Sequence, residues 1–200
     1  MIKHLENFIE KIQSGKVEVY NEFSLQHELG IFLREILKKE GYKVEFERNI
    51  RHFEIFKTVK KEIDIVIYKE DNKGNKKDKY AIELKFPRKG QYPEQMYSFV
   101  KDIMFMEQLK NNGFKKTYCM TLVDDAKFYS NEGRLKIDGI YRYFRSVTSM
   151  CIPANEEIYR PTGKKDENEN SLILTQDHEI NWKKFENTQL DKWRYYLIEI

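Results

Sequence analysis

Two apolar segments with a period of two residues, 62–69 (EIDIVIYK) and 80–87 (YAIELKFP), constrain the fold of this chain most strongly. In each segment apolar side chains alternate with other residues, as in a β-strand that turns one face toward a core. The residues between them, 70–79, are polar and include Asn and Gly, which is typical of a turn. The two segments are therefore expected to pair as a long β-hairpin.

Helical and strand-like patterns surround this hairpin. Apolar residues recur every three or four positions in three segments, which predicts helices over 2–13, 24–37 and about 93–109. Ser24 is the expected cap of the second helix, and Gly41 its stop signal. We expect further strands at 42–47, 116–123 and 193–200, a weaker strand at 141–144, a helix or turn near 182–185, and a polar loop over 161–170. This order predicts an α/β fold with a central mixed β-sheet flanked by helices.

Composition sets outer limits on the class of protein. The 200 residues, 40% of them hydrophobic, suffice for one globular domain spanning 1–200. The net charge of +3 permits a nucleic-acid partner without requiring one. No apolar run approaches the ~20 residues of a membrane span, and the amino terminus lacks the apolar core of a signal peptide. We therefore expect a soluble, cytoplasmic protein without a membrane segment.

Three charged residues interrupt the apolar hairpin. Alternation assigns the isoleucines at 63, 65 and 67 to one face of the first strand, and the apolar residues at 82, 84 and 86 to one face of the second. The opposite face then gathers Asp64, Glu83 and Lys85 around one spot. Two neighbouring carboxylates repel unless a cation lies between them, and oxygen ligands suit Mg²⁺ or Mn²⁺. Such an ion would activate water, and the lysine could orient that water or stabilise a transition state.

This arrangement, Asp64 followed by Glu83-Leu84-Lys85 on the next strand, resembles the signature of the PD-(D/E)XK nuclease superfamily, which has the restriction-endonuclease-like fold. The resemblance covers residues 20–125, and the carboxy-terminal extension, 126–200, matches nothing in that pattern. It implies a DNA nuclease in which Asp64 and Glu83 bind Mg²⁺ or Mn²⁺ and Lys85 acts at the nucleophile. Many members add a glutamate from a preceding helix, a position that Glu28 matches. Ile63 stands where the motif's name has proline.

Basic and amide residues near the motif are candidates for contact with nucleic acid. The segment 38–61 holds eight Lys and Arg against four Glu, interleaved with aromatic residues, and could contact phosphates or stack on unpaired bases. A solvated edge strand whose lysines prevent aggregation explains the same pattern equally well. Gln95 and Lys101 lie on the helix after the motif, where the first could orient water and either could touch phosphate. The candidate contacts are Arg51, Lys60, Lys61, Arg88, Lys89, Gln95 and Lys101, with Arg142 and Arg145 as a weaker second group.

Two other interpretations stay open. The chain could be a catalytically inactive module that keeps this fold and holds nucleic acid or a protein, or an unrelated α/β domain whose acids coincide by chance. DNA is the expected partner under the nuclease interpretation, in a role in restriction and defence or in repair. A homodimer is a further expectation, because cutting both strands is simplest with two sites.

Overall fold

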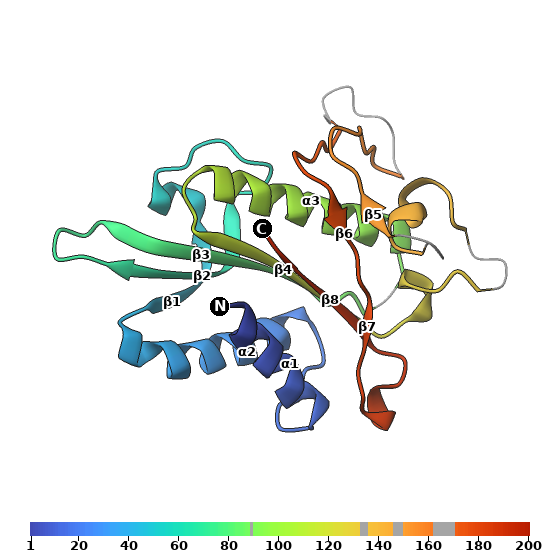
Figure 1. The fold of residues 1–200 in the computed structure, drawn as a ribbon, viewed down its shortest axis with the longest axis horizontal. Coiled ribbons are helices and arrows are strands. Elements are labelled where there is room, and N and C mark those ends of the chain that lie inside the picture. The colour runs from blue at the N-terminus through green and yellow to red at the C-terminus, as the bar shows by residue number, and fades with distance from the viewer. Residues whose placement is uncertain (89, 133–135, 146–149, 162–170) are drawn as a thin grey trace.

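The computed structural model describes residues 1–88, 90–132, 136–145, 150–161 and 171–200. At its centre is a six-stranded sheet of order β1-β2-β3-β4-β8-β7 (Figure 1). These strands span Lys43–Asn49 (β1), Glu62–Glu70 (β2), Lys76–Lys85 (β3), Lys116–Val123 (β4), Lys183–Lys184 (β7) and Arg194–Glu199 (β8). β3 and β4 run parallel and the other neighbours run antiparallel. The predicted class, an α/β fold with a central mixed sheet flanked by helices, is confirmed.

Helices cover both faces of the sheet. α1 (Ile2–Gln13) and α2 (Glu22–Leu37) lie on one face, and α3 (Tyr92–Asn111) lies on the other (Figure 1). α3 connects the parallel strands β3 and β4, as parallel neighbours require a crossover segment. Because both faces are covered, residues 65–68 of β2 are buried on either side of the strand. No helix in the described ranges is long and apolar enough to cross a membrane.

The sheet separates two apolar cores. Ile65 and Ile67 of β2 pack with Leu84 of β3 on the side of α1 and α2. Val66 and Ala81 pack on the opposite side, against α3 and the carboxy-terminal third of the chain. Side chains of successive residues in β2 therefore enter different cores, which fixes the register of the hairpin.

The expected alternation fails at the first residues of β2. Ile63 packs in the core beneath α3 and does not share the face of Ile65 and Ile67, so that part of the prediction is wrong. The strand pairing is interrupted at the same place, because Glu47 of β1, opposite Asp64, has a left-handed backbone with φ 49°. The irregularity in the β1–β2 pairing therefore lies at Asp64, the first carboxylate of the motif.

α2 begins earlier than the sequence predicts. Its cap is Asn21 and not Ser24: the Asn21 side chain accepts a hydrogen bond from the Ser24 N–H at 2.7 Å, and the Ser24 hydroxyl accepts one from the Asn21 N–H at 3.0 Å. This reciprocal capping box satisfies two amide donors at the helix start. Glu22 is consequently the first helical residue. At the other end Gly41, in the left-handed conformation at φ 76°, ends the helical segment as expected.

The carboxy-terminal third contributes to the main sheet and to the core beneath α3. β8 pairs with β4 in the main sheet, while β5 (Cys151–Ile152) and β6 (His178–Glu179) form a separate small sheet. The strand expected at 141–144 is wrong: from Gly139, whose φ is 58°, to Tyr143 the chain forms a 3-10 helix. The helix or turn expected near 182–185 is also wrong, because this segment forms strand β7 and pairs with β8. Most of the expected loop, 162–170, lies outside the described residues. The 3-10 helices are Lys38–Glu40, Ile50–Phe53, Ala126–Phe128, Gly139–Tyr143 and Thr188–Leu190.

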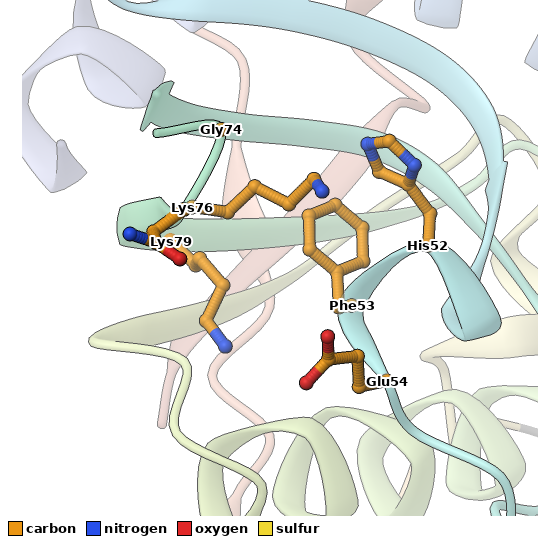
Figure 2. A pocket seen from close by; sticks show the side chains of 7 residues that line it. His52, Phe53, Glu54, Gly74, Lys76 and Lys79 are labelled. Carbon is orange, nitrogen blue, oxygen red and sulfur yellow. The ribbon is translucent and has the colours of Figure 1, made fainter. Parts of the chain in front are cut away.

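The turn end of the β2–β3 hairpin carries a pocket of about 210 Å³. Figure 2 shows Lys76 and Lys79 of the hairpin facing His52 and Glu54, which follow β1. The ammonium of Lys79 lies 5.1 Å from the ring centre of Phe114, and burial lowers the pKa of that lysine. This basic pocket holds one carboxylate, Glu54, and it lies at the end of the hairpin opposite to the motif residues.

Candidate active site

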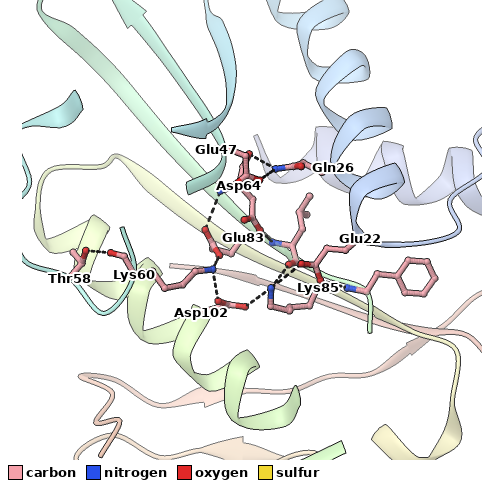
Figure 3. A network of polar contacts seen from close by, with 11 residues as sticks. Glu22, Gln26, Glu47, Thr58, Lys60, Asp64, Glu83, Lys85 and Asp102 are labelled. Carbon is pink, nitrogen blue, oxygen red and sulfur yellow. Dashed lines mark hydrogen bonds and ion pairs between the residues drawn. The ribbon is translucent and has the colours of Figure 1, made fainter. Parts of the chain in front are cut away.

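The structure brings Asp64, Glu83 and Lys85 together where β2 begins and β3 ends (Figure 3). The two carboxylates bind across the strand pair: the Asp64 N–H donates to Glu83 Oε1 at 3.2 Å, and the Leu84 N–H donates to Asp64 Oδ2 at 2.8 Å. Each acid is thus fixed by the backbone of the strand that carries the other. The sequence predicted this convergence from the spacing of two paired strands.

The amino terminus of α2 adds a residue that sequence reasoning missed. The Glu22 carboxylate accepts a hydrogen bond from the Phe86 N–H at 3.0 Å and from the Lys85 ammonium at 3.2 Å. It therefore ties the start of α2 to the end of β3 and holds the motif lysine in place. The sequence offered one indication of this role: with Asn21 as the cap, Glu22 becomes the first residue of the helix.

Glu28, the helix glutamate expected to complete the acid set, is not among the residues gathered here. Gln26, one turn after Glu22, contacts the site: its amide donates to the Asp64 carbonyl oxygen at 2.8 Å and also to Glu47. Glu28 lies two positions further along α2, which rotates its side chain by about 200° from Gln26. The expected position of Glu28 does not fit this geometry, and α2 presents Glu22 and Gln26 to the strands instead.

Lys60 and Asp102 complete the network (Figure 3). The Lys60 ammonium forms ion pairs with Glu83 and with Asp102, the latter at 2.8 Å. Sequence reasoning treated Lys60 as a surface contact for nucleic acid; it is instead an internal partner of the acids, with 24% of its side chain exposed. Asp102, which was missed, is a buried acid on the apolar face of α3, one position before the core residue Ile103. An acid within an apolar stripe was the signal available.

Burial dominates the electrostatics of these acids. It raises the pKa of Asp64 to about 6. It also raises the pKa of Glu83 well above its usual range, and the charges of Asp64 and Asp102 add to that rise. For Lys60 burial opposes the charge, but Asp102, Glu83 and Asp64 raise its pKa above the ordinary value overall. The lysine is therefore protonated, and its charge lowers the pKa values of Asp64 and Glu83, but burial outweighs this effect at both acids.

The type of donor atom suits a hard divalent cation, but the present positions of these atoms do not enclose one. One oxygen of Asp102, Oδ2, is buried and has no hydrogen-bond partner, and its neighbouring charge is the Lys85 ammonium at 3.5 Å. Asp64, Glu83 and Asp102 offer carboxylate oxygens alone, which are the ligands of Mg²⁺ and Mn²⁺. As the side chains stand, no three Asp, Glu, His or Cys residues in the described part of the chain are close enough together to hold an ion. The Lys60 ammonium lies between two of the carboxylates.

The remaining predicted contacts lie outside this network. Arg51 and Lys61 are exposed, and Gln95 and Lys101 are half-buried on α3. Arg88 is exposed and pairs with Asp124 at 2.9 Å. Lys89 lies outside the described residues.

The weaker second group of arginines is structural in part. Arg145 is buried, and its guanidinium donates to the carbonyl oxygens of Lys136 and Lys127, so it cannot contact a nucleic acid. Arg142 is paired with Glu156. The prediction of a nucleic-acid contact at Arg145 is wrong, because the side chain closes a turn of the carboxy-terminal third.

Comparison of the chain with protein-family models, with curated proteins and with solved structures finds no match.

Proposed function

We propose that this protein is a metal-dependent nuclease of the PD-(D/E)XK type, which hydrolyses phosphodiester bonds of DNA in the cytoplasm with Mg²⁺ or Mn²⁺. The observation that supports it best is the junction of Asp64, Glu83 and Lys85 at neighbouring strand ends, with each acid bound to the other strand's backbone. Buried carboxylates with raised pKa values beside a lysine are typical of functional sites. A buried charge lowers the stability of the fold, so its presence is better explained by a function than by packing. The order α2-β1-β2-β3-α3-β4 is also the one that the family resemblance implies.

The site residues would have separate roles in metal binding and in stabilising the phosphate. Asp64 and Glu83 would hold the cation, and Asp102 Oδ2, which accepts no hydrogen bond and lies 3.5 Å from the Lys85 ammonium, would be a further ligand. A bound divalent ion would supply Lewis acidity toward water and toward the scissile phosphate. Lys85, whose pKa Asp102 and Glu22 raise against the effect of burial, would stabilise negative charge that develops on the phosphate.

The surface around the site suits a polyanion with accessible bases. Phe56, four residues before Lys60, is 78% exposed, and Lys57 and Lys61 of the same segment are exposed. Phe23, next to Glu22 on α2, is 71% exposed. Lysines that pair with phosphates and exposed rings that stack on bases are the usual elements of such a surface. A homodimer that cuts both strands, in defence or in repair, belongs to the same proposal.

A cleavage assay with matched variants tests this function. Plasmid, linear duplex and single-stranded DNA are incubated with the protein in Mg²⁺, Mn²⁺ or EDTA. We expect cleavage that requires metal and that falls by about 100-fold or more in Asp64→Asn and Lys85→Met. Glu6→Gln, an exposed acid of α1, is the control and should cleave as the wild type does. Cleavage that survives both site variants would contradict the proposal.

The second candidate is a binding module without catalysis. The ion pair between Lys60 and Glu83 favours it, because it neutralises a carboxylate that a nuclease needs for its metal. Such a module would bind DNA in EDTA with an affinity that falls steeply with salt, and it would cleave none of the three substrates with either metal. Fluorescence anisotropy in EDTA, run beside the cleavage assay, separates the two functions.

A further inference from the structure

Lys60 occupies the position between Glu83 and Asp102 that a cation would take. Its ammonium contacts both carboxylates, whose side chains are 0% and 5% exposed. The lysine reaches them from the loop before β2, and two hydrogen bonds shape that loop: the Thr58 hydroxyl donates to the Lys60 carbonyl oxygen, and the Val59 N–H donates to Gln108 on α3 at 2.7 Å. The loop conformation therefore places the Lys60 ammonium against the two carboxylates.

This arrangement leaves acceptor capacity unused. The Lys60 ammonium has three hydrogen-bond donors. Each carboxylate that it contacts has two oxygens with about four acceptor sites, so the acceptors outnumber the donors. One Asp102 oxygen accepts no hydrogen bond although the residue is only 3% exposed, and the Lys85 ammonium lies 3.5 Å from it. A divalent ion takes six or more oxygen ligands and would use these atoms more fully than one ammonium does.

Resting on the proposed function, we propose that Lys60 is a resident counter-ion, which holds Glu83 and Asp102 together until a divalent cation displaces its ammonium from Glu83. The lysine stem is flexible and 24% exposed, so the ammonium has a path toward solvent. Once released, it lies beside the metal position and is free to pair with a phosphate of the substrate. Metal binding and exposure of the Lys60 amine are then the same event.

Competition predicts a change in metal affinity. Full-length wild type, Lys60→Met and the control Lys61→Met, which removes an exposed charge one residue away, are titrated with Mn²⁺ by calorimetry. We expect Lys60→Met to bind Mn²⁺ about tenfold more tightly or better, since a nearby like charge shifts such equilibria by that order. Lys61→Met should bind as the wild type does. Equal affinity in all three proteins overturns the proposal.

A measurement on the wild type avoids the risk that Lys60→Met fails to fold. Amines are acetylated briefly with and without Mg²⁺, and labelling at each lysine is read by mass spectrometry. We expect Mg²⁺ to raise the labelling rate at Lys60 severalfold and to leave Lys61 unchanged. Mn²⁺ binding without faster labelling at Lys60 overturns the displacement while leaving the metal site intact. If no protein binds Mn²⁺ or Mg²⁺, the proposed function fails together with this inference.

Discussion

Asp64 is the residue whose environment says most about the site. It stands third in β2 and is bound to the backbone of β3, yet burial disfavours its charge and raises its pKa to about 6. An apolar residue there would be compatible with the two buried faces of the strand. The presence of an acid here is therefore better explained by its charge than by packing. The effect of burial on that charge can be measured as the dependence of the free energy of unfolding on pH.

Asp64→Asn should stabilise the protein at neutral pH. The folded pKa, about 6, exceeds the ordinary value of 3.8, so the carboxyl contributes stability below pH 4 that is lost as the pH rises through 6. Asparagine mimics the neutral acid, so in EDTA the variant's free energy of unfolding at pH 8 should exceed that of the wild type by roughly 2–3 kcal/mol.

Urea denaturation between pH 4 and pH 8 measures this difference, which should vanish at the acid end. Glu6→Gln, which changes an exposed acid of α1, should show no such trend. A variant less stable than the wild type at pH 8 would mean that attraction to Lys60 and Lys85 outweighs the effect of burial.

At the scale of elements, α2 has to lie close to β1 for Glu22 and Gln26 to meet the strands. Gly30 permits this approach, because a Cβ built there would lie 2.0 Å from the ring of Phe46 on β1. The Arg34 guanidinium also packs over the Phe46 ring, 4.7 Å from the ring centre. The glycine thus sets the distance between the helix and the edge of the sheet.

Gly30→Ala should destabilise the protein by about 1–3 kcal/mol, although alanine favours helices by about 1 kcal/mol. The physical reason is that an aromatic ring in contact with backbone cannot move aside freely. Urea denaturation gives the value, and the double variant Gly30→Ala/Phe46→Leu, compared with Phe46→Leu alone, supplies the control. If alanine is as harmful when Phe46 is absent, the ring contact is not the cause.

Elements with a clear period were predictable, and contacts between elements were not. β4 was expected at 116–123 and is found there, because a buried strand bounded by Gly113 and two acids has no competing pattern. Asp64, Glu83 and Lys85 converge as predicted, since pairing alone brings them together. The contacts of Lys60 and Asp102 with the motif acids were not predictable, because a loop and a crossover helix bring these two residues to the strand ends. Local periodicity contains no information on which loop residue turns inward.

At the scale of the whole molecule, the carboxy-terminal third is joined to α3 by a buried hydrogen-bonded pair, Glu107 and His178. Glu107 of α3 accepts hydrogen bonds from the N–H groups of Thr175 and Gln176 at 2.8 and 3.1 Å, and its carboxylate lies 2.8 Å from His178 Nε2. Both side chains of the pair are at most 4% exposed. Because α3 also carries Asp102, this contact links the carboxy-terminal segment to the helix that supports the site.

Glu107→Gln should weaken that link. The amide replaces one acceptor oxygen by a donor, which then faces an N–H group, and a buried donor left without an acceptor costs about 1–3 kcal/mol. Burial opposes the charge of Glu107, but hydrogen bonds from His178 and Thr175 hold its pKa below the usual range. The stability that Glu107 supplies is therefore present above its ordinary pKa and is lost as the pH falls through the lower, folded value.

Hydrogen exchange read by mass spectrometry locates the effect of Glu107→Gln. We expect faster exchange at Thr175 and Gln176, whose amides lose their acceptor, and a smaller change in β2 and β3. Glu186→Gln, an exposed acid before β8, is the control and should exchange as the wild type does. Faster exchange spread evenly over the sheet would instead mean that the pair stabilises the whole fold as one cooperative unit. Unchanged exchange at 175–176 would show that the pair does not hold this segment.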